Sequence, residues 1–307
     1  MTTGRSTVSS CAACAPLAGN PSDRYGGALV AMPLTDLTAM AALREAGGEF
    51  THRSSDPELV AIVEATVATY AERGAELPPV ELSLSTNIPP GVGLGRTAAL
   101  VIATLRSLAA FDGRRSWPAD DLAATALAVL HGLGADAAPG DVLVQAHARP
   151  LSMTFGPDVV EPLALPDELA PFVAWSADDT TAIGASIDAA PRTSQRSLRR
   201  RFEGGDPDVV AAMGELRVQA GRARRGILSS DVKLLADAMH RTLAVRLRIT
   251  DVSPTERRLI EIGRSAGAVV NCTGSGRSVI GLARHAEHLE IVAAAYESAG
   301  AHVITLA

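Results

Sequence analysis

The chain has 307 residues, of which 47% are hydrophobic and 20% are charged. This apolar content is sufficient for a full hydrophobic core, so extensive intrinsic disorder is excluded. The net charge of −6 argues against non-specific binding of nucleic acid, which requires a basic surface. The sequence shows no run of 18 apolar residues and no secretory signal, so we expect a cytoplasmic enzyme or binding protein without a membrane or nucleic-acid partner.

The first half of the chain is predicted to mix strands with helices. Residues 1–9 are rich in Thr, Ser and Gly and are expected to be frayed. Asp56 is the expected N-cap of the first helix, with Pro57 at its first position. Apolar periodicity predicts helices at 57–73, 97–111 and 118–130, and strands at 29–34, at 80–84 and near Met153 and Phe155.

The second half is predicted to begin with three consecutive helices. Their expected start signals are Asp206, Ser230 and Ser253. Strands and helices in both halves predict an α+β fold with two domains, residues 1–165 and 166–307. The predicted helices are 207–228, 231–249, 254–266 and 285–298, and the predicted strands are 268–271, 278–282 and 301–305.

Three cysteines, Cys11, Cys14 and Cys272, are too few for a disulfide framework. Cys11 and Cys14 form a CxxC pair, but no second CxxC or HxxxH pair accompanies it, as a zinc site would require. We therefore expect small buried thiols rather than a metal site or a redox pair.

A glycine-rich loop follows the predicted strand 80–84 and precedes the predicted helix 97–111. It reads PPGVGLGRTAA from Pro89 to Ala99. Glycines allow backbone N–H groups to converge, and a helix N-terminus favours negative charge, so this order of elements suits phosphate binding. The loop has neither the GxxxxGK[ST] nor the GxGxxG pattern. From spacing alone, a phosphate site and a plain turn both stay open.

Two further segments accompany this loop. TGSGRS, at residues 273–278, lies between two short apolar stretches and by itself is typical of a hairpin turn. GNPSDRYGG, at residues 19–27, precedes the predicted strand 29–34. The order and separation of the three glycine-containing motifs carry more information than any one of them.

Together the three motifs resemble the GHMP kinase superfamily, which includes galactokinases, homoserine kinases and mevalonate kinases. PPGVGLGRTAA is similar to the superfamily's PxxxGLGSSAA, TGSGRS is similar to its third motif, and the GNPSD…GG opening looks most like glucuronokinase. The resemblance covers about residues 15–282. It implies a two-domain α+β fold, with an N-terminal ribosomal-protein-S5-like domain, a C-terminal ferredoxin-like domain and ATP between them.

The resemblance also implies roles for individual residues. Residues 139–145 and 153–155 match the segment that carries the superfamily's catalytic carboxylate, which points to Asp141 as the base; the alternative is an ordinary helix N-cap. Thr97 would be a Mg²⁺ ligand. The implied ATP-binding residues are Gly91, Gly93, Leu94, Gly95, Arg96 and Thr97, and the implied substrate-binding residues are Asn20, Ser22, Asp23, Thr273, Gly274 and Ser275.

Two arginines depart from the superfamily pattern. Arg96 and Thr97 stand where consecutive serines are usual, and Arg277 replaces a glycine of the third motif. Arginine can hold phosphate oxygens bidentately, so we expect Arg96 to neutralise a phosphate oxygen. The alternative is that Arg96 points to solvent.

Two charged groups that the superfamily usually has are missing. Residues 123–133 contain no acid where a Mg²⁺-binding Glu is usual, and Asp136 is the nearest carboxylate. Cys14 stands where a basic residue is usual. The departures therefore fall at the implied reactive centre.

The leading hypothesis is an ATP-dependent kinase that uses Mg²⁺ and phosphorylates a hydroxyl of a sugar or sugar acid, with Asp141 as base. Arg199 and Arg201 are candidates to face an anionic acceptor, or they belong to a solvated charge run. The second hypothesis is a non-kinase descendant that binds a nucleotide or phosphorylated metabolite, with altered or lost phosphoryl transfer. The sequence leaves the acceptor and the oligomeric state open.

Overall fold

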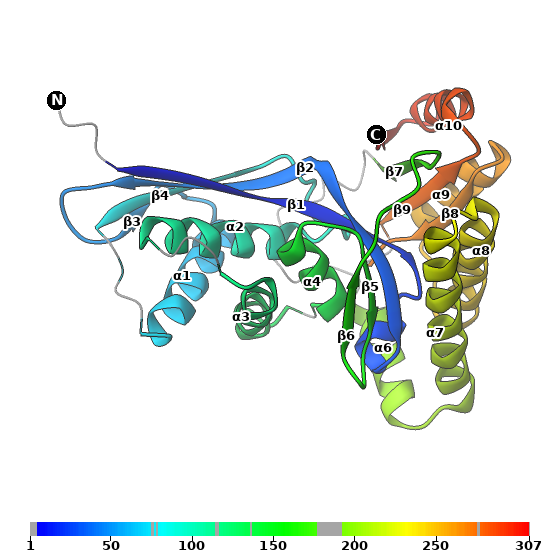
Figure 1. Ribbon diagram of the computed structural model, residues 1–307, viewed down its shortest axis with the longest axis horizontal. Helices are drawn as coiled ribbons and strands as arrows, with labels where there is room; N and C mark the ends of the chain where they lie inside the picture. The colour runs from blue at the N-terminus through cyan, green and yellow to red at the C-terminus, as the bar shows by residue number, and fades with distance from the viewer. Residues whose placement is uncertain are drawn as a thin grey trace. The chain divides into compact units, whose positions relative to one another are not determined.

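The computed structural model describes residues 5–74, 77, 79–113, 117–135, 137–176, 192–274 and 277–306 (Figure 1). The chain divides into two compact units whose segments alternate along the sequence. Unit 1 comprises Met1–Ala13, Leu37–Ile88 and Gly95–Ala148; unit 2 comprises Cys14–Asp36, Pro89–Leu94 and Arg149–Ala307. Both units contain strands and helices, which confirms the α+β class. The domain boundary after residue 165 stays a prediction.

Two long strands, β1 (Ser6–Ala18) and β2 (Ala28–Glu45), pair with each other and contribute residues to both units. In unit 1, β2 pairs antiparallel with β4 (Val80–Thr86), and β3 (Thr51–His52) pairs parallel with β4. The expectation that residues 1–9 are frayed is wrong from Arg5 onward. The amide of Arg5 donates to Glu45 Oε2, and the Glu45 amide donates to the Arg5 carbonyl, because β2 is long enough to offer this segment a partner.

Four helices of unit 1 gather on one face of its strands (Figure 1). Asp56 caps α1, as predicted: its Oδ1 accepts the Glu58 amide at 2.8 Å. Helix α2 is buried over almost its whole circumference from Ala98 to Leu105, as expected for a helix that is apolar all round. The helices are α1 (Pro57–Glu72), α2 (Arg96–Phe111), α3 (Ala119–Gly132) and α4 (Pro139–His147); α4 is not among the predicted elements.

Unit 2 contains an antiparallel sheet in the order β10-β7-β9-β8. A short 3₁₀ helix, η1 (Ser22–Tyr25), precedes β2, whose first residues pair with β5. The strands are β5 (Leu151–Thr154), β6 (Val159–Pro162), β7 (Ala170–Ser176), β8 (Val269–Cys272), β9 (Ser278–Ala283) and β10 (Ala301–Thr305). The helices are α6 (Arg192–Glu203), α7 (Pro207–Leu228), α8 (Val232–Ile249), α9 (Pro254–Ser265) and α10 (Ala286–Ser298).

The start of α8 differs from the prediction by one residue. Asp231, rather than Ser230, is the N-cap, and its Oδ1 accepts the Leu234 amide at 2.9 Å. Ser230 has a φ of 54° and belongs to the turn that ends α7. Of the described helices, none combines the length and the apolar character that a membrane crossing requires.

The sheet of unit 2 packs closely because β9 carries a glycine where a neighbouring ring lies. The Phe172 and Tyr296 rings have centroids 5.5 Å apart and belong to the core of this unit. A Cβ on Gly281 would lie 2.3 Å from Phe172 Cζ and 2.7 Å from the Val269 carbonyl oxygen. Only glycine allows this approach without a shift of the ring or the backbone.

We therefore expect Gly281→Ala to destabilise the protein by about 1–3 kcal/mol, the usual cost of overpacking a core. The control is Gly214→Ala in α7, where a Cβ would meet nothing within 4 Å. Alanine there is expected to stabilise by up to about 1 kcal/mol, because it favours a helix over glycine. Urea unfolding of both variants measures the difference, and equal stabilities would contradict the packing argument.

Candidate functional site

The sign of the backbone φ angle alternates along the glycine-rich loop. Gly91, Gly93 and Gly95 have φ of 72°, 78° and 73°, whereas the intervening Val92 and Leu94 are buried and do not have positive φ. Residues with side chains rarely adopt such positive values. Alternation of this kind turns successive N–H groups toward a common concavity, which is an anion-binding nest.

Six consecutive amides, from Gly93 in the loop to Ala98 in the first turn of α2, form a row of donors. Within the described parts of the chain, the backbone N–H groups from Gly93 to Ala98 donate no hydrogen bond. Leu94 and Ala98 are buried. The amides of Arg96, Thr97 and Ala98 belong to the first turn of α2, where no helical acceptor exists, and together with those of Gly93, Leu94 and Gly95 they form a row of donors that suits a ligand rich in acceptor oxygens.

In unit 1, α4 holds the last glycine of the loop. Gln145 Nε2 donates to the Gly95 carbonyl at 3.0 Å and to the Ala12 carbonyl at 2.9 Å. Asp141 lies four residues before Gln145 and therefore on the same face of α4. The N-cap of α4 is Ala138, so the alternative reading of Asp141 as an N-cap is wrong. The structure thus brings Asp141 and the anchor of Gly95 onto one helix face.

Arg96 has a partner on α1. Its Nη1 lies 2.9 Å from Glu58 Oε2, and the two side chains are only 14% and 19% exposed. The alternative that Arg96 points to solvent is therefore wrong. Its expected contact with a phosphate oxygen stays a prediction, and Glu58 already balances its charge.

In unit 2, the third motif is tied to the loop through buried hydroxyls. Thr273 Oγ1 and Ser278 Oγ are 2.6 Å apart, and Ser278 Oγ donates to the Val92 carbonyl at 2.7 Å. The Cys14 amide donates to the Leu94 carbonyl at 3.2 Å. The segment is also a hairpin, as its pattern predicts, because the Thr273 amide bonds the Ser278 carbonyl between antiparallel β8 and β9.

A buried arginine that was not predicted from the sequence binds the backbone of this motif. Arg246 of α8 is 7% exposed and donates through Nη1 to the carbonyls of Cys272 and Thr273. Glu256 is also buried, and burial raises its pKa while the charge of Arg246 opposes that rise. The sequence does contain a sign of this burial. Arg246 follows Leu243 and Val245 in the apolar stripe of a predicted helix, at a position where a hydrophobic residue is usual.

The first motif uses its polar side chains inside unit 2. Asn20 Nδ2 donates to the Cys272 carbonyl at 2.9 Å, and Asn20 Oδ1 accepts from Asn271 Nδ2 at 2.9 Å. Ser22 Oγ bonds both the amide and the carbonyl of Ala28. Asp23 is buried at 4% exposure. The substrate-binding roles of Asn20, Ser22 and Asp23 stay predictions, and the structure gives the first two a positioning role.

The remaining predicted residues are placed as follows. The Gly274 carbonyl accepts from Gln195 Nε2 of α6 at 3.4 Å. Arg201 forms an ion pair with Asp206 at 2.8 Å, so its charge is engaged within unit 2. Ser275 and Asp136 lie outside the described residues.

All three cysteines are free and buried, as expected. Burial raises the pKa of the Cys11 thiol to about 12 and also raises the pKa of Cys272, so these thiols stay protonated at neutral pH. In the part of the chain that the structure describes, no group of three or more His, Cys, Asp or Glu side chains is placed to hold a metal ion.

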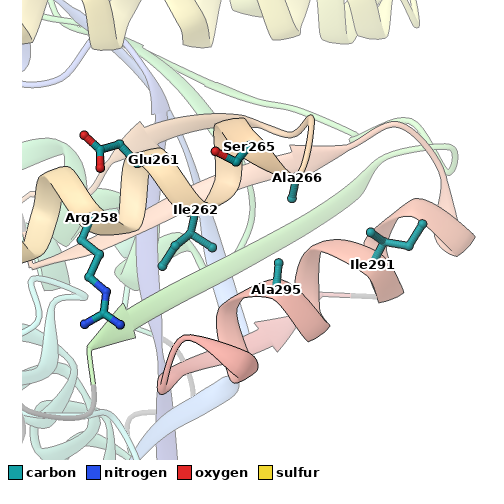
Figure 2. Close-up of a pocket in the computed structure, with 7 residues that line it drawn as sticks. All are labelled: Arg258, Glu261, Ile262, Ser265, Ala266, Ile291 and Ala295. Carbon is teal, nitrogen blue, oxygen red and sulfur yellow. The ribbon is translucent and has the colours of Figure 1, made fainter.

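One cavity of about 460 Å³ lies between α9 and α10 of unit 2 (Figure 2). Arg258 at its rim donates to the Ala299 carbonyl at 2.8 Å. The cavity contains none of the predicted site residues. Its lining is Arg258, Glu261, Ile262, Ser265, Ala266, Ile291 and Ala295.

Comparison with known proteins places this fold. Residues 60–149 match the family described as GHMP kinases N terminal domain. No curated protein sequence matches the chain.

Three solved structures show how much of the chain shares the fold. Streptococcus pneumoniae phosphomevalonate kinase, in complex with phosphomevalonate and AMPPNP, has a TM-score of 0.77 at 13% identity and covers 98% of this chain and 100% of its own. Mevalonate kinase from methicillin-resistant Staphylococcus aureus has a TM-score of 0.68 at 21% identity, covering 98% and 99%. Lactococcus lactis galactokinase, complexed with galactose, has a TM-score of 0.76 at 13% identity, covering 99% and 94%. The protein therefore has the two-domain α+β fold of the GHMP kinases, as the sequence motifs predict.

The buried arginine beneath the third motif, Arg246, gives a stability prediction. Arg246→Met should destabilise the protein by about 3–5 kcal/mol, because the carbonyls of Cys272 and Thr273 would each lose a donor and the buried Glu256 would lose the charge that opposes the rise of its pKa. The control is Arg248→Met on the same helix. Arg248 pairs with Glu215 at the surface, where both side chains are about half exposed, and its loss should cost less than about 1 kcal/mol. Denaturant unfolding of both variants measures the contrast, and a similar loss of stability in each would show that the buried arginine has no special role.

Proposed function

We propose that this protein is an ATP-dependent kinase that transfers the γ-phosphoryl group of ATP to a hydroxyl of a small molecule. The row of unpartnered amides from Gly93 to Ala98 carries this proposal. A triphosphate offers the dense set of acceptor oxygens that such a row requires. The structure of S. pneumoniae phosphomevalonate kinase with AMPPNP supports the choice of an adenine nucleotide.

Phosphoryl transfer depends on positioning and on neutralisation of phosphate charge. The loop amides would hold phosphate oxygens, and Asp141 would accept the proton of the attacking hydroxyl. A bound Mg²⁺ ion would supply further charge neutralisation. Thr97 offers it one hydroxyl, so we expect phosphate oxygens and water to provide most of its ligands.

For the acceptor, we propose a sugar or sugar acid, as in glucuronokinase-like enzymes. The support is the GNPSD…GG opening of the sequence and the likeness to galactokinase, whose structure contains galactose. Asp23, a buried carboxylate in η1, is the candidate partner of a sugar hydroxyl. ADP release with Mg²⁺-ATP across sugars, uronic acids, mevalonate, phosphomevalonate and homoserine tests this choice, and turnover of mevalonate but no sugar would contradict it.

A second candidate is a non-kinase descendant that binds a nucleotide without transfer. The ion pair between Arg96 and Glu58 favours it, because this arginine is then not available to stabilise a transferring phosphoryl group. ATP binding without ADP release for any acceptor would support this candidate over the kinase.

Nucleotide binding at the loop is tested by Gly93→Val. A β-branched residue at φ of 78° is strained and would crowd the nest, so ATP binding should be lost while the fold is kept. Gly113→Val is the matched control, because Gly113 has φ of 82° in a turn where a Cβ meets nothing within 4 Å. Titration calorimetry with ATP compares the two, and unchanged affinity in Gly93→Val would remove the loop from the nucleotide site.

The role of Asp141 is tested by Asp141→Asn. The amide is nearly isosteric but does not accept the proton, so ATP affinity should change by no more than a few fold while turnover falls by about a hundred-fold or more. Asp237→Asn, at an exposed position of α8, should leave both quantities unchanged. Retention of most activity in Asp141→Asn would move the base elsewhere, with Asp23 as the next candidate.

A further inference from the structure

The two arginines of the glycine-rich motifs have different surroundings. Arg96 is paired with Glu58 at 2.9 Å. Arg277, by contrast, has no hydrogen bond or ion pair within the described ranges of the chain. Its side chain is partly buried, so it is a charged group near the third motif that no acid of the described chain balances.

Arg277 lies against the start of the glycine-rich loop, within unit 2. A Cβ built on Gly91 would be 3.7 Å from Arg277 Nη1, and Gly91 is exposed. The next residue, Ser278, is fully buried and bonds the Val92 carbonyl at 2.7 Å. This bond, one residue from Arg277 and one from Gly91, fixes the backbone of the arginine relative to the loop.

The guanidinium of Arg277 therefore has no acidic partner in the described chain and lies beside the anion-binding loop. We propose that Arg277 is a phosphate-binding residue, whose guanidinium contacts phosphate oxygens of the ligand held by the loop. This inference rests on the proposed function, in which that ligand is ATP. A guanidinium keeps its charge at all physiological pH values and donates through a planar fork that matches phosphate oxygens.

Comparison of Arg96 with Arg277 shows which of the two arginines is available to bind phosphate. Both arginines depart from the superfamily pattern, but Arg96, the one expected from the sequence to contact phosphate, already has a carboxylate partner in unit 1. Arg277 therefore supplies the positive charge that the loop amides do not, and the affinity for phosphates should depend on it. Because the contact is with phosphate rather than with the base or sugar, adenosine binding should not depend on it.

The experiment is titration calorimetry with ATP, ADP, inorganic tripolyphosphate and adenosine, each in Mg²⁺ and in EDTA. The proteins are the wild type, Arg277→Ala, Arg277→Lys and the control Arg241→Ala, at an exposed position of α8. Arg277→Ala should weaken ATP, ADP and tripolyphosphate by about ten- to a hundred-fold, the usual worth of a charge-assisted hydrogen bond. Arg277→Lys should fall between wild type and Arg277→Ala, and adenosine affinity should be equal in all four proteins.

The outcomes separate this inference from the proposed function. Equal affinities of wild type and Arg277→Ala for ATP and tripolyphosphate would overturn the inference and leave the kinase proposal standing. Arg277-dependent binding of tripolyphosphate with no ADP release for any acceptor would overturn the kinase proposal and support the inference. A wild type that binds none of the phosphate compounds would overturn both.

Discussion

Hydrogen bonds to three of its own carbonyl oxygens hold the glycine-rich loop in its conformation. Ser278 bonds the Val92 carbonyl, Cys14 bonds the Leu94 carbonyl and Gln145 bonds the Gly95 carbonyl. Within the described residues, the amides from Gly93 to Ala98 have no acceptor, so they are free to bind a ligand. Alternating positive φ at the glycines makes this arrangement possible, and the rest of the candidate site depends on it.

Buried polar groups support those anchors from within each unit. In unit 2, Arg246 holds two carbonyls at the end of β8, and Asn271 and Asn20 bond each other beside them. Loss of any of these bonds would be costly, since an unpaired buried charge or amide costs more than the bond contributes. The network therefore fixes the position of the third motif, and substitution of any of its members is expected to destabilise the protein. In unit 1, Gln145 has the same role for the start of α2.

Several elements and motifs were predictable because their signals are local. Pro57 after Asp56, Pro207 after Asp206 and Pro254 after Ser253 start helices by capping chemistry that needs no tertiary contact. The alternation at 80–84 likewise predicts β4. The start of the first strand was missed because Val8 is the one apolar residue among residues 6–9, and only pairing with β2 makes this segment a strand. Helix α4 was missed because it is short, and only its contacts distinguish it from a turn.

The candidate site divides in the same way. The sequence by itself determined the glycine spacing and the α+β class, which follow from backbone requirements and from the order of the elements, and its resemblance to the GHMP kinases pointed to Asp141 as the residue to test. Only the tertiary structure decided which polar atoms are already bonded, and this separates residues that the sequence treats alike. Arg96 and Arg277 are both arginines in glycine-rich motifs, but Glu58 lies 38 positions from Arg96 in the chain and 2.9 Å from it in space. No local pattern contains that pairing, because it arises from packing of α1 against α2.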